Sequence, residues 1–156
     1  MNVGNWPRCK TGFTLIELLV TIIVVVVLAT MAIPSFRTLV GESRHSADVN
    51  EIVASLSYAR NEAVKRREDV VLEVSSDSGN WVIEVFIDPD GEDKEILRSF
   101  QSGFSQVVVP DGIVKFNSSG SVVAGSCEWG DCVIEVSGWR QTRIQVSMSG
   151  RPYIIE

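Results

Sequence analysis

The sequence has one histidine, His45, among its 156 residues. Its many serines include no G-x-S-x-G motif, and none has a general base paired with it in the sequence. His45 stands beside Arg44 in a polar helical stretch, so we expect a solvated side chain and not a general base. Without a catalytic set, we expect no enzymatic activity and no cofactor.

Positive charge is also scarce, with 14 Lys and Arg against 20 Asp and Glu and a net charge of −6. Such a field disfavours nonspecific binding to phosphate backbones. Three cysteines are too few for an ordinary zinc site, since Cys127 and Cys132 have no histidine near them in the sequence. Their C-x4-C spacing favours a local disulfide, which would place the C-terminal part in an oxidising compartment.

The acidic segment "DPDGED", Asp88 to Asp93, is the best metal candidate, with four carboxylates in six residues. Its spacing does not fit an EF-hand, because Gly91 stands at the fourth position and no bidentate glutamate follows. Asp-Gly between two apolar runs instead predicts a hairpin turn. We therefore expect no bound metal here, with a calcium site as the alternative.

The chain does have a long apolar run, Phe13 to Ile33, with 21 nearly unbroken apolar positions. As a helix it would measure about 31 Å, the thickness of a bilayer core. It is longer than the apolar core of a signal peptide, and no A-x-A site follows it. We expect it to remain as a transmembrane helix, although basic residues on both sides leave its orientation undecided.

One carboxylate, Glu17, lies in the first turn of that run, where an unpaired charge is expensive. The stretch "GFTLIELLV" resembles the class III leader and N-terminal segment of type IV pilins and type II secretion pseudopilins. The resemblance implies cleavage after Gly12 by a prepilin peptidase and N-methylation of Phe13. It also implies that Glu17 meets the Phe13 amine of a neighbouring subunit, where pairing offsets desolvation. The alternative is that Glu17 only snorkels at the membrane surface.

The expected domains are a removed leader (1–12), a transmembrane half-helix (13–34), an amphipathic half-helix (35–67) and a β-rich domain (68–156). Pro34 fits the position at which pilins have a kink or melted stretch, and Gly41 is a second weak point. An apolar stripe indicates the face that the second half-helix buries. The stripe consists of Val49, Ile52, Val53, Leu56, Ala59 and Ala63. The other side would carry Asp48, Glu51, Ser55, Glu62 and Lys65.

Nine short strand-like runs follow, separated by Gly, Asn, Asp and Ser. They cover residues 70–76, 81–88, 94–100, 105–110, 112–117, 121–124, 131–138, 140–148 and 151–155. The predicted fold class is α+β: a long N-terminal helix packed on an antiparallel β-sandwich-like domain.

This layout, with the "ARNEAVKR" stretch of residues 59–66, resembles the GspH/FimT group of minor pilins and pseudopilins. The resemblance implies a single-pass protein of the bacterial inner membrane that later joins a filament. The expected Cys127–Cys132 disulfide, which needs an oxidising compartment, predicts a periplasmic domain and hence a cytoplasmic N-terminus. The protein's partners would be other minor and major pilins or pseudopilins and the prepilin peptidase. The leading hypothesis is a minor subunit of the tip or initiation complex of a type IV pilus, and the first alternative is a type II secretion pseudopilin.

A second alternative is a DNA-uptake receptor, because some FimT-like members bind DNA through a C-terminal Gly-Arg-x-Arg motif. Gly150 and Arg151 match that motif, but Tyr153 replaces its second arginine. Arg140 and Arg143 would have to complete the basic patch. After loss of the leader, 12 basic residues face 20 acidic ones, a net charge of −8, so we expect only weak DNA binding.

Overall fold

The computed structural model describes residues 12–77, 80–87, 94–102 and 107–155. The chain forms two compact units, Met1–Leu39 and Val40–Glu156. One helix, α1 (Leu15–Arg66, 52 residues), contributes to both units. The boundary between the units falls after Leu39, and the expected change from transmembrane to amphipathic helix after residue 34 stays a prediction.

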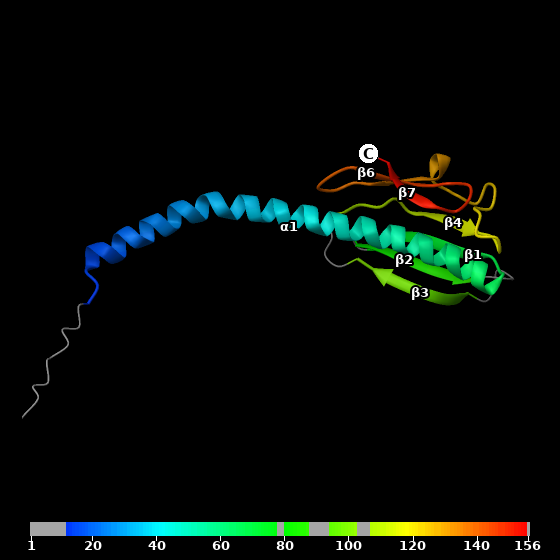
Figure 1. Cartoon of the computed structure of the whole chain (residues 1–156), viewed down its shortest axis with the longest axis horizontal. Coiled ribbons are helices and arrows are strands. Elements are labelled where there is room, and N and C mark those ends of the chain that lie inside the picture. The colour runs from blue at the N-terminus through cyan, green and yellow to red at the C-terminus, as the bar shows by residue number, and fades with distance from the viewer. Residues whose placement is uncertain (1–11, 78–79, 88–93, 103–106, 156) are drawn as a thin grey trace, which may run out of the picture. The chain divides into compact units, whose positions relative to one another are not determined.

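In the first unit, α1 begins where Thr14 caps it, with the Thr14 hydroxyl accepting a hydrogen bond from the Glu17 backbone N–H at 3.2 Å. At Pro34 α1 continues as a helix and is not melted, and the expected kink at this residue stays a prediction (Figure 1). A proline removes one helix hydrogen bond, and the Thr38 hydroxyl adds a local one by donating to the Pro34 carbonyl at 3.2 Å.

In the second unit, α1 buries the predicted stripe: Val49, Ile52, Leu56, Ala59 and Ala63 are buried, and Val53 is partly buried. Two residues assigned to the polar side are buried as well, so that assignment was wrong for them. Ser55 satisfies its hydroxyl on Glu51 Oε1 at 3.3 Å. Glu62 accepts hydrogen bonds from Lys65 and then Arg66, each at 2.9 Å, and these contacts lower the pKa of Glu62.

The first sheet has four antiparallel strands in the order β3-β2-β1-β4. They are β1 (Val70–Asp77), β2 (Asn80–Ile87), β3 (Glu95–Gln101) and β4 (Gly112–Phe116). Alternate residues of β1 and β2 point into the core, as the period of a strand requires. Val70, Leu72 and Val74 are buried on β1, and Trp81, Ile83 and Val85 on β2.

The second sheet has three antiparallel strands in the order β5-β6-β7. They are β5 (Val133–Val136), β6 (Thr142–Val146) and β7 (Pro152–Ile155), and a short 3-10 turn, η1 (Gly130–Cys132), precedes them. One hydrophobic core joins α1 to both sheets, as the arrangement in Figure 1 allows. The predicted α+β class, with a helix packed on antiparallel sheets, is confirmed.

Two predicted strands are not strands. Around residues 105–110, of which 107–110 are described, Val108 forms a single bridge with Ser137. The pairing stops there because Pro110 has no N–H to donate, and its carbonyl accepts the Trp129 indole N–H at 3.2 Å. In 121–124, only Val122 bridges to Phe116. The two sheets consequently remain separate.

Candidate functional site

The apolar helix of the first unit is the first candidate. Its side chains from Phe13 to Leu39 are exposed, apart from a half-buried Ala29. Phe13 is 86% exposed and Leu28 62%. By length and hydropathy α1 is able to cross a membrane, and its most apolar stretch contains no buried residue. No described residue covers this surface, and lipid or another protein is the usual cover for a surface this apolar.

Glu17 is the charged residue at the start of this surface. Its backbone N–H donates to Thr14, but within the described part of the chain its carboxylate makes no hydrogen bond or ion pair. The spacing Thr-x-x-Glu is that of a capping box, a signal from which the start of the helix could have been predicted. Gly12 and Phe13 are exposed just before the helix, and the leader residues 1–11 lie outside the described residues.

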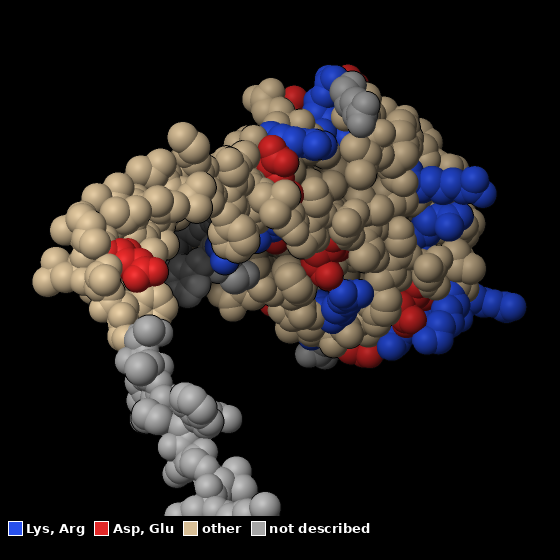
Figure 2. Space-filling view, turned by 60° about the vertical axis from the view of Figure 1, so that its left-hand side comes forward, with Lys and Arg blue, Asp and Glu red and all other residues tan. Residues whose placement is uncertain are grey.

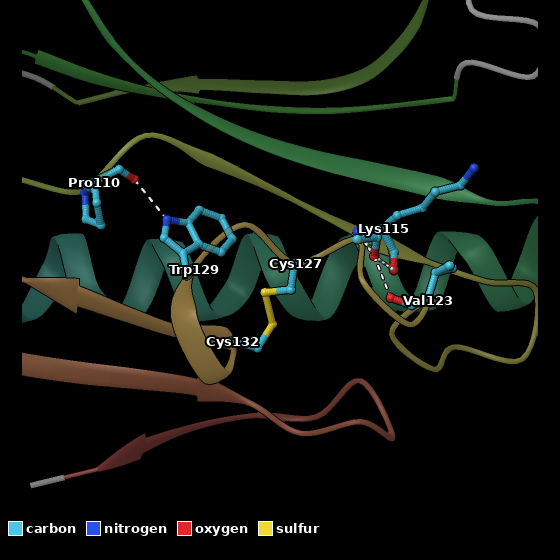
Figure 3. Close-up of a disulfide and its surroundings, with 7 residues drawn as sticks. Pro110, Lys115, Val123, Cys127, Trp129 and Cys132 are labelled. Carbon is cyan, nitrogen blue, oxygen red and sulfur yellow. Dashed lines mark hydrogen bonds between the residues drawn. A yellow bond between two sulfur atoms is a disulfide. The ribbon is translucent and has the colours of Figure 1, made fainter.

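The disulfide predicted from the C-x4-C spacing is present between Cys127 and Cys132, with Cα atoms 5.6 Å apart (Figure 3). The loop that it closes carries Trp129, which is buried and donates its indole N–H to Pro110. The Trp129 ring also covers Gly112, where an added Cβ would lie 2.7 Å from the ring. The disulfide thus holds a tryptophan that fills the space between the two sheets.

His45 is buried, only 1% exposed, and the prediction of a solvated side chain is wrong. Its Nε2 pairs with the Thr142 hydroxyl at 2.9 Å, whereas its Nδ1 has no partner among the described residues. Burial, and next the nearby Arg140, lower the pKa of His45, while Asp48 acts in the opposite direction.

Gly41, one turn before His45, is buried beneath Trp139, and a Cβ there would overlap the indole ring. Its small size therefore serves close packing of the β5–β6 loop, and the expectation that it is a weak point of the helix stays a prediction. Trp139 and Thr142 together anchor this loop to α1.

Lys94 joins two carboxylates on neighbouring strands, with its Nζ 2.6 Å from Glu84 and 3.1 Å from Glu73. It also lies 4.0 Å from the centre of the Phe86 ring. The hydrogen bond to Glu84 is the main cause that raises the pKa of Lys94. The calcium candidate 88–93 lies outside the described residues, and the described ranges contain no group of three His, Cys, Asp or Glu placed to hold a metal ion.

Gly150, proposed as part of a DNA-binding motif, has a structural task. It adopts φ 76° in a tight turn whose Ser147 N–H donates to the Arg151 carbonyl at 3.0 Å. A Cβ at Gly150 would collide with the Gly120 carbonyl of a similar turn. Arg60 of α1 donates to Gly120 at 3.1 Å and to Ser149 at 3.3 Å, which ties both turns to the helix.

The three arginines of the suggested DNA patch are exposed but do not converge. Arg143 stands opposite Ile155 on β7, whereas Arg151 lies across from Ser147. Four residues along a strand separate these positions by about 13 Å. Arg140 precedes β6 and is farther still from Arg151. Figure 2 shows Lys and Arg in several separate patches, with acidic residues between them.

An exposed, membrane-length helix that continues into a helix packed on antiparallel sheets defines a pilin-like subunit. Two family models match the chain in agreement with this class. The model described as "Type II transport protein GspH" matches residues 48–150. The model described as "Prokaryotic N-terminal methylation motif" matches residues 7–33. The chain belongs to the GspH family.

Individual relatives agree with this assignment. A "Fimbrial protein" of Pseudomonas aeruginosa is 25% identical over 123 residues, covering 76% of this chain and 77% of the relative. Two crystal structures of the P. aeruginosa type IV minor pilin FimU superimpose with TM-scores of 0.54 and 0.55, at 16% and 18% identity. They cover 74% of this chain and 92% and 88% of FimU, respectively. The chain is therefore a pilin-like member of the GspH family with the same fold as FimU.

Proposed function

We propose that the protein is a minor pilin that enters the tip or initiation complex of a type IV pilus and supports assembly of the filament. The observation that carries this proposal is Glu17, a carboxylate without a partner among the described residues, in an exposed apolar helix. The fimbrial relative and the FimU fold favour a pilus over other filaments.

In this proposal the prepilin peptidase cuts after Gly12, and the new N-terminal Phe13 is methylated. The apolar half of α1 then spans the inner membrane as a single pass. The Cys127–Cys132 disulfide favours a periplasmic location for the second unit and hence a cytoplasmic N-terminus. Gly12→Ala should prevent cleavage, and the N-terminal sequence of membrane-extracted protein would reveal it. A native chain that still begins at Met1 would contradict the processing step.

Assembly then depends on a charge pair between subunits. The Phe13 amine lies one helical turn before Glu17, so a neighbouring subunit shifted along the helix axis brings the two groups together. Both would be buried in an apolar bundle, where breaking such a pair costs about 3–5 kcal/mol. Glu17 would thereby set the register of the subunit in the filament.

The test is Glu17→Ala, measured both in the membrane fraction and in sheared filaments or co-purified minor subunits. We expect normal membrane levels, because the lone helix loses an expensive charge, but loss of incorporation. Glu42→Ala is the matched control, since Glu42 is an exposed carboxylate of the same helix beyond the apolar run. Normal incorporation of Glu17→Ala would reduce Glu17 to a snorkelling residue and overturn the pairing.

A type II secretion pseudopilin is the alternative, and the description of the matching family favours it. Deleting the gene separates the two. If the proposal is right, the deletion should reduce surface pili and leave protein secretion unchanged. Normal piliation with a defect in secretion would show that the subunit belongs to the secretion system.

A further inference from the structure

The free edge of β7 is the feature from which this inference starts. β7 pairs only with β6 among the described strands, so its other edge has no strand partner there. The bond from Ser147 N–H to the Arg151 carbonyl fixes which residues face β6. By the alternation of antiparallel pairs, Tyr153 and Ile155 bond to β6. The Pro152 carbonyl and both backbone groups of Ile154 therefore point away from the sheet.

Apolar side chains flank this open edge on both faces of the sheet. Ile154 stands opposite the fully buried Ile144, yet Ile154 is 48% exposed. On the other face Tyr153 is 47% exposed, and its hydroxyl donates to Gln145 at 2.7 Å, which holds the ring along the sheet. Unpaired backbone groups beside uncovered apolar side chains are what an added strand would satisfy.

The charge of the surrounding hairpin selects the kind of strand. Residues 138–155 contain Arg140, Arg143 and Arg151 and no Asp or Glu, within a chain whose net charge is −6, although Glu135 on β5 stands opposite Arg143 and Glu156 follows Ile155. Arg143 and Arg151 are exposed near opposite ends of β7. Carboxylates flanking an added strand would meet these arginines.

We propose that the open edge of β7 receives an extended, acidic strand of a partner protein, which becomes the fourth strand of the β5-β6-β7 sheet. A second copy of this chain is a poor occupant, because it would bring two basic hairpins together. The β5 edge is a poorer acceptor than β7, because Val108 already bridges to Ser137 at its end. This docking edge goes beyond the proposed function and does not depend on Glu17.

The probe is a fluorescent peptide of about ten residues that alternates Val and Thr and carries Asp and Glu at both ends. The full chain in detergent micelles is added to the peptide, and binding is followed by the fluorescence anisotropy of the peptide. We expect saturable binding that Ile154→Pro abolishes, since proline removes only the outward N–H of an edge strand. Ser99→Pro is the matched control, because the same alternation points the Ser99 N–H outward from the β3 edge. It should bind the peptide like the wild type.

Amide exchange of the wild-type protein provides a second measurement that does not rely on any variant folding. Adding the peptide should slow exchange of the Ile154 amide and leave that of Ser99 unchanged. Reversing both charges, Arg143→Glu with Arg151→Glu, should weaken the acidic peptide about tenfold and favour a Lys-ended version of it.

Four results with the peptide and the protein alone would overturn the proposal. They are equal affinity for the acidic and Lys-ended peptides, binding unaffected by Ile154→Pro, an unprotected Ile154 amide, and a concentration-dependent dimer of the wild type that Ile154→Pro dissolves. A short DNA duplex serves as the competing probe. Binding of DNA that the charge reversal removes and Ile154→Pro leaves intact would assign this surface to nucleic acid instead.

Discussion

Leu28 and Leu56 are leucines of the same helix, yet Leu28 is 62% exposed and Leu56 is fully buried. In the second unit, α1 finds its apolar partners within the chain, on two sheets. In the first unit it finds none among the described residues, so its partners must be lipid or other subunits. Apolar side chains thus stabilise the fold in one half of α1, whereas in the other half they are exposed, as the membrane anchoring and assembly proposed above require.

The largest effect on stability is expected from a substitution in the buried half of α1, and the same substitution in the exposed half tests the comparison. Leu56→Ala should lower the free energy of unfolding by about 2–5 kcal/mol, because it removes core contacts and leaves a cavity. Leu28→Ala should change it by less than about 0.5 kcal/mol, since Leu28 makes no core contact. Denaturant unfolding of both variants in the same micelles measures the difference, and equal losses would contradict the division of α1.

Two glycines of the second unit sharpen the comparison between backbone strain and packing. Gly125 (φ 75°) and Gly150 (φ 76°) share a left-handed conformation, but a Cβ at Gly125 meets nothing within 4 Å. Gly125→Ala should therefore destabilise by about 1–2 kcal/mol from conformation alone. Gly150→Ala should lose more, because its Cβ also meets the Gly120 carbonyl. Thermal melts measure the loss of stability in each variant. Equal losses would show that the turns at Gly120 and Gly150 can move apart to accept the added Cβ without further cost.

The predicted effect of the disulfide is of similar size. Replacing both Cys127 and Cys132 by Ala should cost about 2 kcal/mol, the value expected for a short closed loop. Reductant should lower the melting temperature of the wild type towards that of the double variant and leave the variant unchanged. If reductant destabilises both proteins equally, the effect belongs to another part of the chain.

The sequence predicted what local pattern determines: the helix, its buried stripe, seven strands and the disulfide. The two false strands, 105–110 and 121–124, have strand-like composition, but each forms only a single bridge. Pro110 removes the next donor of the first, and this loss matters only because β5 lies beside it. The strand propensity of single residues gives no information about which strand lies beside them.

The wrong prediction for His45 and the packing roles of Gly41 and Gly150, which the sequence did not reveal, have one physical origin. Each residue resembles a local feature, namely a helix breaker, a solvated base or part of a Gly-Arg motif. Each is instead determined by a distant partner, respectively Trp139, Thr142 and Gly120. The prediction for Glu17 came from a motif that a peptidase and a neighbouring subunit would recognise, so it required no knowledge of the fold.

The smallest expected effect concerns the pH dependence of the second unit, which should follow His45. The buried Nδ1 has no described partner, and Arg140 lies near, so the folded state disfavours the imidazolium and the pKa of His45 is lowered. Asp48 opposes this shift only in part. As the pH falls below about 6.5, the unfolded chain binds a proton that the folded chain resists, so stability should decrease. Above that pH the contribution of His45 is fully present.

Chemical unfolding between about pH 5 and 7 measures the slope in a range where Glu62, whose pKa is lowered, stays ionised. His45→Gln should flatten the slope, whereas Glu42→Gln, on an exposed carboxylate of the same helix, should leave it unchanged. A slope that persists in His45→Gln would place the titrating group elsewhere.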